Sequence, residues 1–195
     1  MKYLWIGFTK LIRYREQVQV LFKWIARFGY LAFLIYGIIE WLRPGALQER
    51  LYRRRTLLYC LFAVSVGSGI SFVVGRIWRR KRPFIAHAEY LPLIPHKDNA
   101  SFPSNHSMNA MAASLILLSR KNNLGVPFLL WSLVLGTSRI VCRLHYISDV
   151  IGGFLLGACC AGMICQSMLA KQLATQLLWF SDGIAEGFRC WRSRW

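Results

Sequence analysis

The stretch Ser138-Arg139-Ile140-Val141-Cys142-Arg143-Leu144-His145-Tyr146-Ile147-Ser148-Asp149 lies between two long apolar segments of the chain. It places two arginines, a histidine and a carboxylate within about three helical turns, next to segments apolar enough to lie in hydrocarbon. Ionisable groups at membrane depth are costly, so a chain that keeps them usually needs them for function. The stretch therefore predicts a membrane-embedded helical fold with a functional site at the membrane boundary.

The composition points to the same class of protein. Of 195 residues, 55% are hydrophobic, yet 25 Lys and Arg face only 8 Asp and Glu, which gives a formal charge of +17. Apolar segments separated by basic clusters are typical of a multi-spanning membrane protein, whose expected partner is the lipid bilayer. The basic excess fits either anionic lipid headgroups or an anionic ligand, and both interpretations stay open. Nucleic acid is not expected as a partner, because the charges form no continuous basic face.

The apolar segments predict an all-α, multi-spanning membrane helix bundle of about five spans. We expect an interfacial amphipathic helix over residues 1–19, a basic loop over residues 48–56 and a surface helix over residues 171–195. No repeat or linker divides the chain, so residues 1–195 are expected to form one domain with its motif-bearing core at about 57–170. The predicted spans are residues 21–42, 57–75, 103–119, 124–140 and 150–170.

Neither cysteine nor metal chemistry is indicated. The six cysteines show no ligand or redox spacing, and five of them lie in or near apolar segments, where a thiol behaves as a small hydrophobe. His87, Glu89, His96 and Asp98 share one loop but lack the spacing of metal ligands. We therefore expect no metal and no other cofactor.

The predicted spans bring four points of the chain to one side of the membrane. The second span leads into Arg82-Pro83, the third begins at Pro103, the fourth ends at Ser138-Arg139 and the fifth begins near His145. With antiparallel crossings, all four points lie at the same membrane face. Convergence of this kind is what an active site at the membrane boundary requires.

Several of these residues are suited to binding an anion. Arg82 and Arg139 can each present a planar fork to phosphate oxygens. The backbone N–H groups of Ser104, Asn105 and His106 lie at the start of a predicted helix, where the positive end of the helix dipole favours anions. An Arg-Pro pair can also simply end a span, and Ser104 can be an ordinary N-cap, so neither feature is decisive alone.

Three further side chains could move protons or attack an electrophile. His106 and His145 are the groups that titrate nearest neutral pH. Asp149 follows His145 by four residues, one turn away on the same helical face, and could hold the imidazole in the tautomer that leaves one nitrogen free as a nucleophile. The same pair could instead be a structural hydrogen bond at a helix start.

At these positions the chain resembles the superfamily named for type 2 phosphatidic acid phosphatase, whose motifs are K-x6-R-P, P-S-G-H and S-R-x5-H-x3-D. The third motif is complete, from Ser138-Arg139 through His145 to Asp149. The second appears as Pro103-Ser104-Asn105-His106, with asparagine in place of glycine.

The first motif is partial. Arg82-Pro83 is present, but Gly75 occupies the lysine position, and Arg76 is the nearest basic residue. The segments 82–84, 93–96 and 100–104 are similar to bacterial undecaprenyl pyrophosphate phosphatases of the bacitracin-resistance type. Those proteins carry an acidic residue at the position of Asn105.

The resemblance implies a metal-independent phosphohydrolase of the cell membrane. It implies that His145 attacks the terminal phosphorus, that Asp149 orients His145, and that His106 protonates the leaving group and then activates water. The residues that it assigns to phosphate binding are Arg76, Arg82, Ser104, Asn105 and Arg139, with Arg143 as a possible addition.

The implied substrate is an isoprenoid lipid pyrophosphate, undecaprenyl pyrophosphate, with the site facing outward. Two alternatives stay open. One is a phosphatase for another lipid phosphate, such as phosphatidate or phosphatidylglycerophosphate. The other is a non-enzymatic membrane transporter that binds anions with the same arginines.

Overall fold

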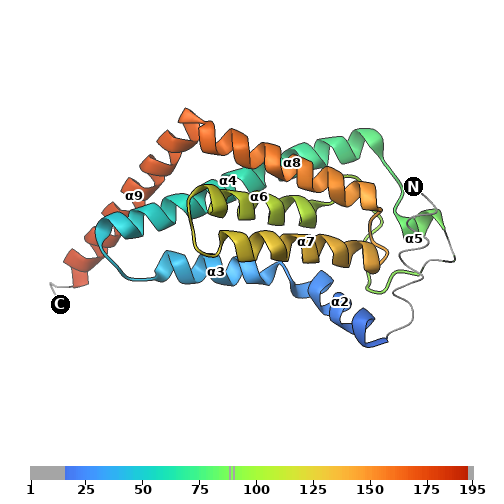
Figure 1. Cartoon of the computed structure of the whole chain (residues 1–195). Helices are drawn as coiled ribbons and strands as arrows, with labels where there is room; N and C mark the ends of the chain where they lie inside the picture. Colours follow the sequence, from blue (N-terminus) through green and yellow to red (C-terminus); the bar gives the residue numbers. More distant parts are fainter. Residues whose placement is uncertain (1–15, 88, 90, 193–195) are drawn as a thin grey trace.

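The computed structural model describes residues 16–87, 89 and 91–192, and the regular elements in these ranges are all α-helices (Figure 1). Most of the interfacial helix expected over residues 1–19 lies outside the described residues. The helices are α2 (Glu16–Phe28), α3 (Leu31–Leu42), α4 (Leu47–Trp78), α5 (Pro83–Ala86), α6 (Asn105–Ser119), α7 (Gly125–Val141), α8 (Ile147–Gln166) and α9 (Met168–Arg192).

Helix α6 lies at the centre of the bundle, where it contacts α4, α7 and α8. Its side chains from Ser107 to Leu117 are almost all buried. Two glycines of α8 allow the close approach of α6 and α8. A Cβ at Gly153 would lie 2.6 Å from the Ser104 carbonyl oxygen, and one at Gly157 would meet the Met108 carbonyl oxygen. Close backbone packing between small residues is a common means of helix association in membranes.

Helix α4 is longer than the sequence suggested. It has 32 residues, or about 48 Å of helix, and it includes residues 48–56, so the prediction of a basic loop there is wrong. Leu, Gln, Glu and Arg are all good helix formers, and Arg53 both pairs with Glu49 one turn earlier and donates to the Arg43 carbonyl oxygen. At its other end α4 stops at Arg79, which adopts a left-handed backbone conformation with φ 48°.

The segment predicted as the first span is two helices rather than one. Helices α2 and α3 meet at an angle of 46° around Gly29 and Tyr30. Gly29 continues the helical hydrogen bonding to Ile25, and its carbonyl oxygen accepts a hydrogen bond from the Trp131 indole at 2.8 Å. The bend is therefore fixed by a contact with α7.

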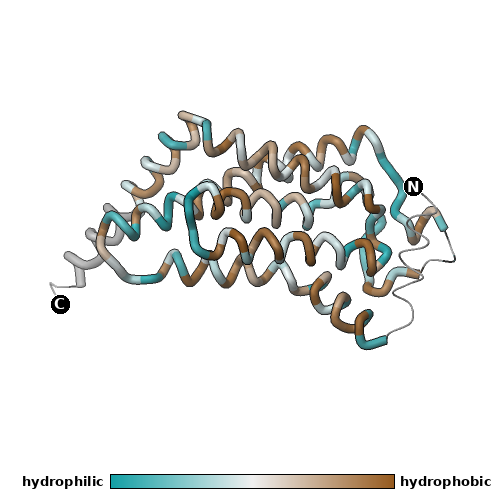
Figure 2. The backbone as a smooth tube through the Cα atoms, viewed as in Figure 1, coloured by the Kyte–Doolittle hydropathy of each residue, from teal (hydrophilic) through white to brown (hydrophobic). Residues whose placement is uncertain are grey.

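The two ends of the bundle are hydrophilic, and hydrophobic residues predominate between them (Figure 2). In the described part of the chain, the segment Leu47–Ala86 and helix α8 are long and apolar enough to span a membrane, and the bent pair α2–α3 makes a third candidate. Helix α7 is a shorter apolar helix, and α6 has 15 residues. The prediction of a helical membrane protein is confirmed, whereas length and apolarity support two or three spans rather than five.

The last two helices differ slightly from the expectation. Helix α8 ends at Gln166, four residues before the predicted end of the fifth span. The tail is helical as predicted, but its first half is more than a surface helix, because Ala174 and Leu178 of α9 join the core formed by Tyr59 and Ala63 of α4. This packing fixes the start of α9 against the bundle.

Candidate active site

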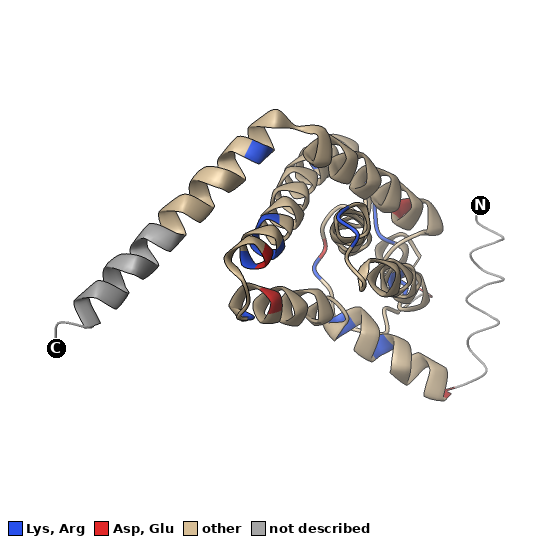
Figure 3. Cartoon of the chain, turned by 60° about the vertical axis from the view of Figure 1, so that its left-hand side comes forward, with Lys and Arg blue, Asp and Glu red and all other residues tan. Residues whose placement is uncertain are grey.

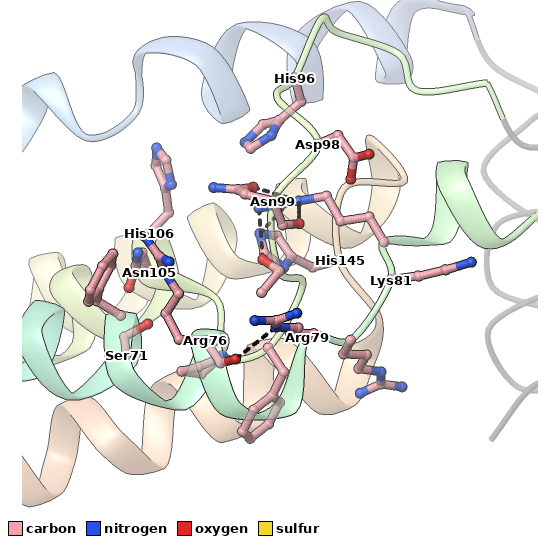
Figure 4. A pocket seen from close by; sticks show the side chains of 17 residues that line it. Ser71, Arg76, Arg79, Lys81, His96, Asp98, Asn99, Asn105, His106 and His145 are labelled. Atoms are coloured by element: carbon pink, nitrogen blue, oxygen red, sulfur yellow. Dashed lines mark hydrogen bonds between the residues drawn. The ribbon is translucent and has the colours of Figure 1, made fainter.

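A cavity of about 600 Å³ lies at the end of the bundle where α4 ends and α6 begins (Figure 4). Five residues singled out from the sequence contribute to its wall, and they come from three separate segments. Asn105 and His106 lie together on one side, and His145 lies across from them beside Asn99 (Figure 4). The residues from the sequence prediction that line the cavity are Arg76, Arg82, Asn105, His106 and His145.

The His145 imidazole is 2% exposed and has a defined partner at each ring nitrogen. Its Nδ1 atom lies 2.7 Å from the Ser101 carbonyl oxygen, and its Nε2 atom lies 3.1 Å from Nη1 of Arg82. A carbonyl oxygen only accepts and a guanidinium only donates, so Nδ1 carries the proton and Nε2 holds a lone pair. Burial lowers the pKa of His145 to about 4, and the positive charges of Arg82 and Arg139 act in the same direction. The imidazole is therefore neutral at pH 7.

Asp149 is fully buried at the start of α8 and accepts three hydrogen bonds. Its Oδ1 atom accepts from Nη1 of Arg80 at 2.6 Å, and its Oδ2 atom accepts from the Ser101 hydroxyl at 2.5 Å and the Tyr146 backbone N–H at 2.9 Å. The sequence predicted that Asp149 orients His145 directly. In the structure Oδ2 is 3.7 Å from the His145 Nδ1 atom, and the Nδ1 hydrogen bond goes to Ser101 instead. The Ser101 carbonyl oxygen is closer to the Nδ1 proton than the Asp149 carboxylate is, and it accepts the hydrogen bond.

Arg82 is 4% exposed and holds the loop that precedes α6 against His145. Its Nε and Nη2 atoms donate to the side-chain oxygen of Asn99 at 3.1 and 2.7 Å, and Nη2 also lies 3.4 Å from the Ala100 carbonyl oxygen. Its Nη1 atom donates to the Leu144 carbonyl oxygen at 2.9 Å and to the His145 ring. A guanidinium has five N–H donors, so Arg82 can contact a phosphate only by exchanging one of these acceptors.

The wall formed by the end of α4 is basic. Gly75, at the lysine position of the first motif, lines the cavity, and a Cβ there would lie 3.2 Å from the Ala100 Cβ. Arg76 is exposed at the cavity, with its guanidinium 5.0 Å from the centre of the Phe72 ring. Arg79 also lines the cavity, and its Nε donates to the Arg76 carbonyl oxygen at 3.1 Å.

Among the polar residues of this cavity that sequence reasoning did not assign to the site, three lie in the basic run 79–82, which was a signal for them, and a fourth lies in the loop before α6. These residues could be placed only once the left-handed turn at Arg79 was known, because that turn decides which side chains of the run face the cavity. The fourth has no sequence signal apart from its position in the loop before α6. The four residues are Arg79, Arg80, Lys81 and Asn99.

The start of α6 differs from the anion site that the sequence suggested. The Ser104 N–H donates to the Asp149 carbonyl oxygen at 3.0 Å, and the Ser104 hydroxyl lies 2.9 Å from that of Ser107. Ser104 is therefore buried with its N–H and hydroxyl already bonded within the protein. Asn105 and His106 begin the helix, where backbone N–H groups lack an intrahelical carbonyl. The His106 ring meets the Tyr30 ring edge to face, with centroids 6.0 Å apart.

Two of the predicted arginines do not line the cavity. Arg139 is 2% exposed, and its Nη1 donates to the Ala26 carbonyl oxygen of α2 at 2.7 Å. Arg143 has a positive φ of 62°, and its Nη1 donates to the Leu91 carbonyl oxygen at 3.0 Å. In the structure both side chains therefore connect separate segments of the fold.

No group of three or more His, Cys, Asp or Glu residues that could hold a metal ion occurs in the described part of the chain. The polar groups of the cavity are arginines, histidines, one lysine, one aspartate, one serine and amides. Such a set is suited to binding phosphate oxygens and to proton transfer.

Comparisons with known proteins show the family to which the chain belongs. The family model described as the PAP2 superfamily matches residues 56–173. Undecaprenyl-diphosphatase BcrC of Bacillus subtilis (strain 168) is 30% identical over 146 residues, which cover 75% of this chain and 72% of that protein.

Two solved structures share the fold. The crystal structure of Aquifex aeolicus LpxE has a TM-score of 0.65 at 21% identity and covers 81% of this chain and 92% of its own. The first transmembrane PAP2 type phosphatidylglycerolphosphate phosphatase from Bacillus subtilis has a TM-score of 0.60 at 22% identity, covering 90% of this chain and 86% of its own. The chain belongs to the PAP2 superfamily, whose lipid phosphate phosphatases are hydrolases.

Proposed function

We propose that this membrane protein removes the terminal phosphate of an isoprenoid lipid diphosphate, with undecaprenyl diphosphate as its substrate. The observation that carries the proposal is a neutral, buried imidazole whose unprotonated Nε2 lies beside Arg82 in a basic cavity. The substrate is suggested by the likeness to undecaprenyl-diphosphatase BcrC. A non-enzymatic anion transporter would have no use for an imidazole held in this tautomer.

In the proposed reaction, Nε2 of His145 attacks the terminal phosphorus, and the bond from phosphorus to the bridging oxygen breaks. The Nδ1–H of the resulting imidazolium stays bonded to the Ser101 carbonyl oxygen, which stabilises its positive charge. Nη1 of Arg82 donates a hydrogen bond to Nε2 in the resting site. When Nε2 attacks, the same N–H donates to a phosphoryl oxygen instead. Charge developing on the phosphoryl group is thus met by a donor already in place.

His106 is proposed as the acid and base of the two steps. It lines the cavity across from His145 (Figure 4), where the negative charge of the bound diphosphate would let its imidazole take up the proton that it then gives to the leaving lipid phosphate. Once deprotonated, it can remove a proton from the water that hydrolyses the phosphohistidine. This division leaves His145 free to act as nucleophile in the first step and as leaving group in the second.

The basic wall favours a diphosphate over a monophosphate. Arg76, Arg79 and Lys81 line the cavity in addition to Arg82, and a second phosphate group would meet these otherwise excess cations. We therefore assign Arg79 and Arg76 to the phosphate that remains on the lipid.

We also propose that the site faces the outside of the cell. The opposite end of the bundle, beyond the catalytic cavity, carries a dense group of basic residues, which the positive-inside rule assigns to the cytoplasm. These residues are Arg50, Arg53, Arg54, Arg55, Arg120 and Lys121. Labelling of a Lys97→Cys variant of a cysteine-free protein in intact cells, with a membrane-impermeant reagent, tests this. Labelling only after permeabilisation would reverse the orientation.

The function is tested on purified protein in detergent with a chelator present. Phosphate release is compared for undecaprenyl diphosphate, phosphatidate and phosphatidylglycerophosphate, for the wild type and for His145→Gln. We expect the diphosphate to give the highest kcat/KM and the variant to release no phosphate. Preference for phosphatidylglycerophosphate would replace the substrate, and full activity of the variant would refute the proposed nucleophile.

A further inference from the structure

A second polar cavity, of about 190 Å³, lies at the other end of the bundle. The end of α3, the start of α4 and the turn between α6 and α7 enclose it. Helix α6 has 15 residues and runs between the two cavities, which places them about 22 Å apart along its axis. We call this cavity the arginine pocket, and the residues that line it include Glu40, Tyr52, Arg53, Arg120 and Lys121.

One guanidinium nitrogen at this pocket is buried and has neither a hydrogen bond nor a carboxylate beside it in the described part of the chain. Nε of Arg120 has no hydrogen-bond partner among the residues that the structure describes, whereas Nε of Arg53 lies 3.4 Å from Oε2 of Glu40. Buried donors are nearly always paired in native proteins, and an exception commonly indicates a ligand, water or ion at that point. Such a donor at the wall of a small polar cavity points to an acceptor that binds there.

The surroundings of Arg120 hold its guanidinium plane in place. The plane lies over the Tyr52 ring, with 4.4 Å from the guanidinium carbon to the ring centre, and 5.6 Å from the Tyr59 ring. Contacts of this kind use the face of the guanidinium and leave its N–H donors in the plane. The Tyr52 hydroxyl also donates to the Arg120 carbonyl oxygen at 2.6 Å, which fixes the backbone.

The charge balance of the pocket favours an anion. Arg53, Arg120 and Lys121 face a single carboxylate, that of Glu40. That carboxylate is already paired, at 3.1 Å with Nη1 of Arg43 and at 3.4 Å with Nε of Arg53. In Figure 3, basic residues gather along the first turns of α4, beside acidic residues of α3 and α4. The positive charges of Arg120 and Lys121 remain without a carboxylate in the pocket.

We propose that the arginine pocket binds a phosphate group on the membrane face opposite the catalytic cavity. A tetrahedral oxyanion has several acceptor oxygens for arginine donors, and the cavity has room for one such group. The same chemistry is offered by the headgroup of an anionic membrane lipid and by free inorganic phosphate. This site takes no part in the phosphatase reaction and does not depend on its substrate.

The test uses delipidated full-length protein and three additions. Native mass spectrometry counts bound phosphatidylglycerol, with phosphatidylcholine as the zwitterionic comparison of zero net charge, and a thermal shift titration measures inorganic phosphate. The variants are Arg120→Gln, Arg120→Lys and the control Lys171→Gln, which removes one positive charge from the start of α9 outside the pocket. Thermal unfolding of each variant without ligand confirms that it is folded.

We expect saturable binding that Arg120→Gln weakens by about tenfold or more, because a charge-assisted hydrogen bond is lost. Lys171→Gln should bind as the wild type does, and Arg120→Lys should be intermediate because it keeps the charge without the planar fork. Binding in the phosphatidylglycerol arm alone identifies a lipid headgroup, and binding in both arms identifies the phosphate group itself. Equal loss in Arg120→Gln and Lys171→Gln, or no saturable binding in either arm, would overturn the proposal.

Discussion

Ser101 joins Asp149 to His145: its hydroxyl donates to Asp149 Oδ2 at 2.5 Å, and its carbonyl oxygen accepts from His145 Nδ1 at 2.7 Å. All three side chains are buried. The carboxylate thus fixes the loop that fixes the imidazole, and the tautomer of His145 depends on a backbone atom. This arrangement makes Ser101 and Arg80 positioning residues for the proposed reaction.

Replacing Ser101 by alanine removes the hydroxyl but keeps the carbonyl. We expect kcat to fall about tenfold, since one hydrogen bond to a charged group is worth about 1.5 kcal/mol, with little change in KM. Steady-state kinetics on the lipid diphosphate measures this. Ser119→Ala, in which a hydroxyl donates to the Ile116 carbonyl oxygen, is the matched control and should keep full activity. A Ser101→Ala enzyme with wild-type kcat would mean that the loop needs no anchor at Asp149.

Arg80 supplies the charge that balances the buried Asp149 carboxylate. Its Nη1 also donates to the Ser148 hydroxyl at 2.7 Å, and its guanidinium lies 4.3 Å from the centre of the Tyr146 ring. Arg80→Gln leaves the carboxylate without its cation, so we expect a loss of about 2 kcal/mol and a melting temperature lower by about 5 °C. Lys81→Gln, at the exposed neighbouring position, should melt as the wild type does. Equal melting of all three proteins would show that the pair adds nothing to stability.

The burial of neutral His145 predicts a specific dependence of stability on pH. Its pKa is about 4 in the folded protein and about 6.5 in the unfolded chain, so the unfolded state binds more protons between these values. The contribution of this residue is complete above pH 6.5, and about 3 kcal/mol of it is lost as the pH falls from 6.5 to 4. Melting temperatures of the wild type and of His145→Gln across this range measure the difference. Parallel curves for the two proteins would contradict the depressed pKa.

We expect Arg79 to bind substrate and to add little to the stability of the fold, because it lines the cavity and is exposed. Arg79→Gln should raise KM for the lipid diphosphate about tenfold while kcat stays nearly constant, the pattern of a lost binding contact. The effect on a lipid monophosphate should be smaller. Arg143→Gln is the matched control, since its side chain bonds to Leu91 outside the cavity. An equal rise of KM in both variants would assign the effect to general surface charge.

Much of the helical pattern could be predicted from the sequence, because apolar runs and their breakers are local signals. Arg43-Pro44-Gly45 ended a helix where expected, and α6 and α7 begin and end within two residues of their predicted bounds. The basic start of α4 differs from the predicted loop, because a run of charged residues can also form a helix. Its ion pairs and carbonyl contacts stabilise a helix instead.

Several residues of the candidate site could be predicted from the sequence, but the hydrogen-bond network that joins them could not. Span parity brought Arg82, His106 and His145 to one cavity. The partners of each side chain depend on backbone geometry that no spacing reveals. Ser101 takes the Nδ1 proton because the loop before α6 brings its carbonyl closer than the Asp149 carboxylate. Arg139, which the motif marks for phosphate, donates to a carbonyl of α2.

The most direct test of the account is to trap the covalent intermediate. Wild-type protein is mixed with lipid diphosphate carrying radiolabel in its terminal phosphate, quenched within milliseconds at alkaline pH and digested. We predict label on the peptide that contains His145 and no label in His145→Gln, whose side chain cannot form the phosphohistidine. Turnover at the wild-type rate in His145→Gln, or label on another residue, would contradict the assignment of His145 as the nucleophile.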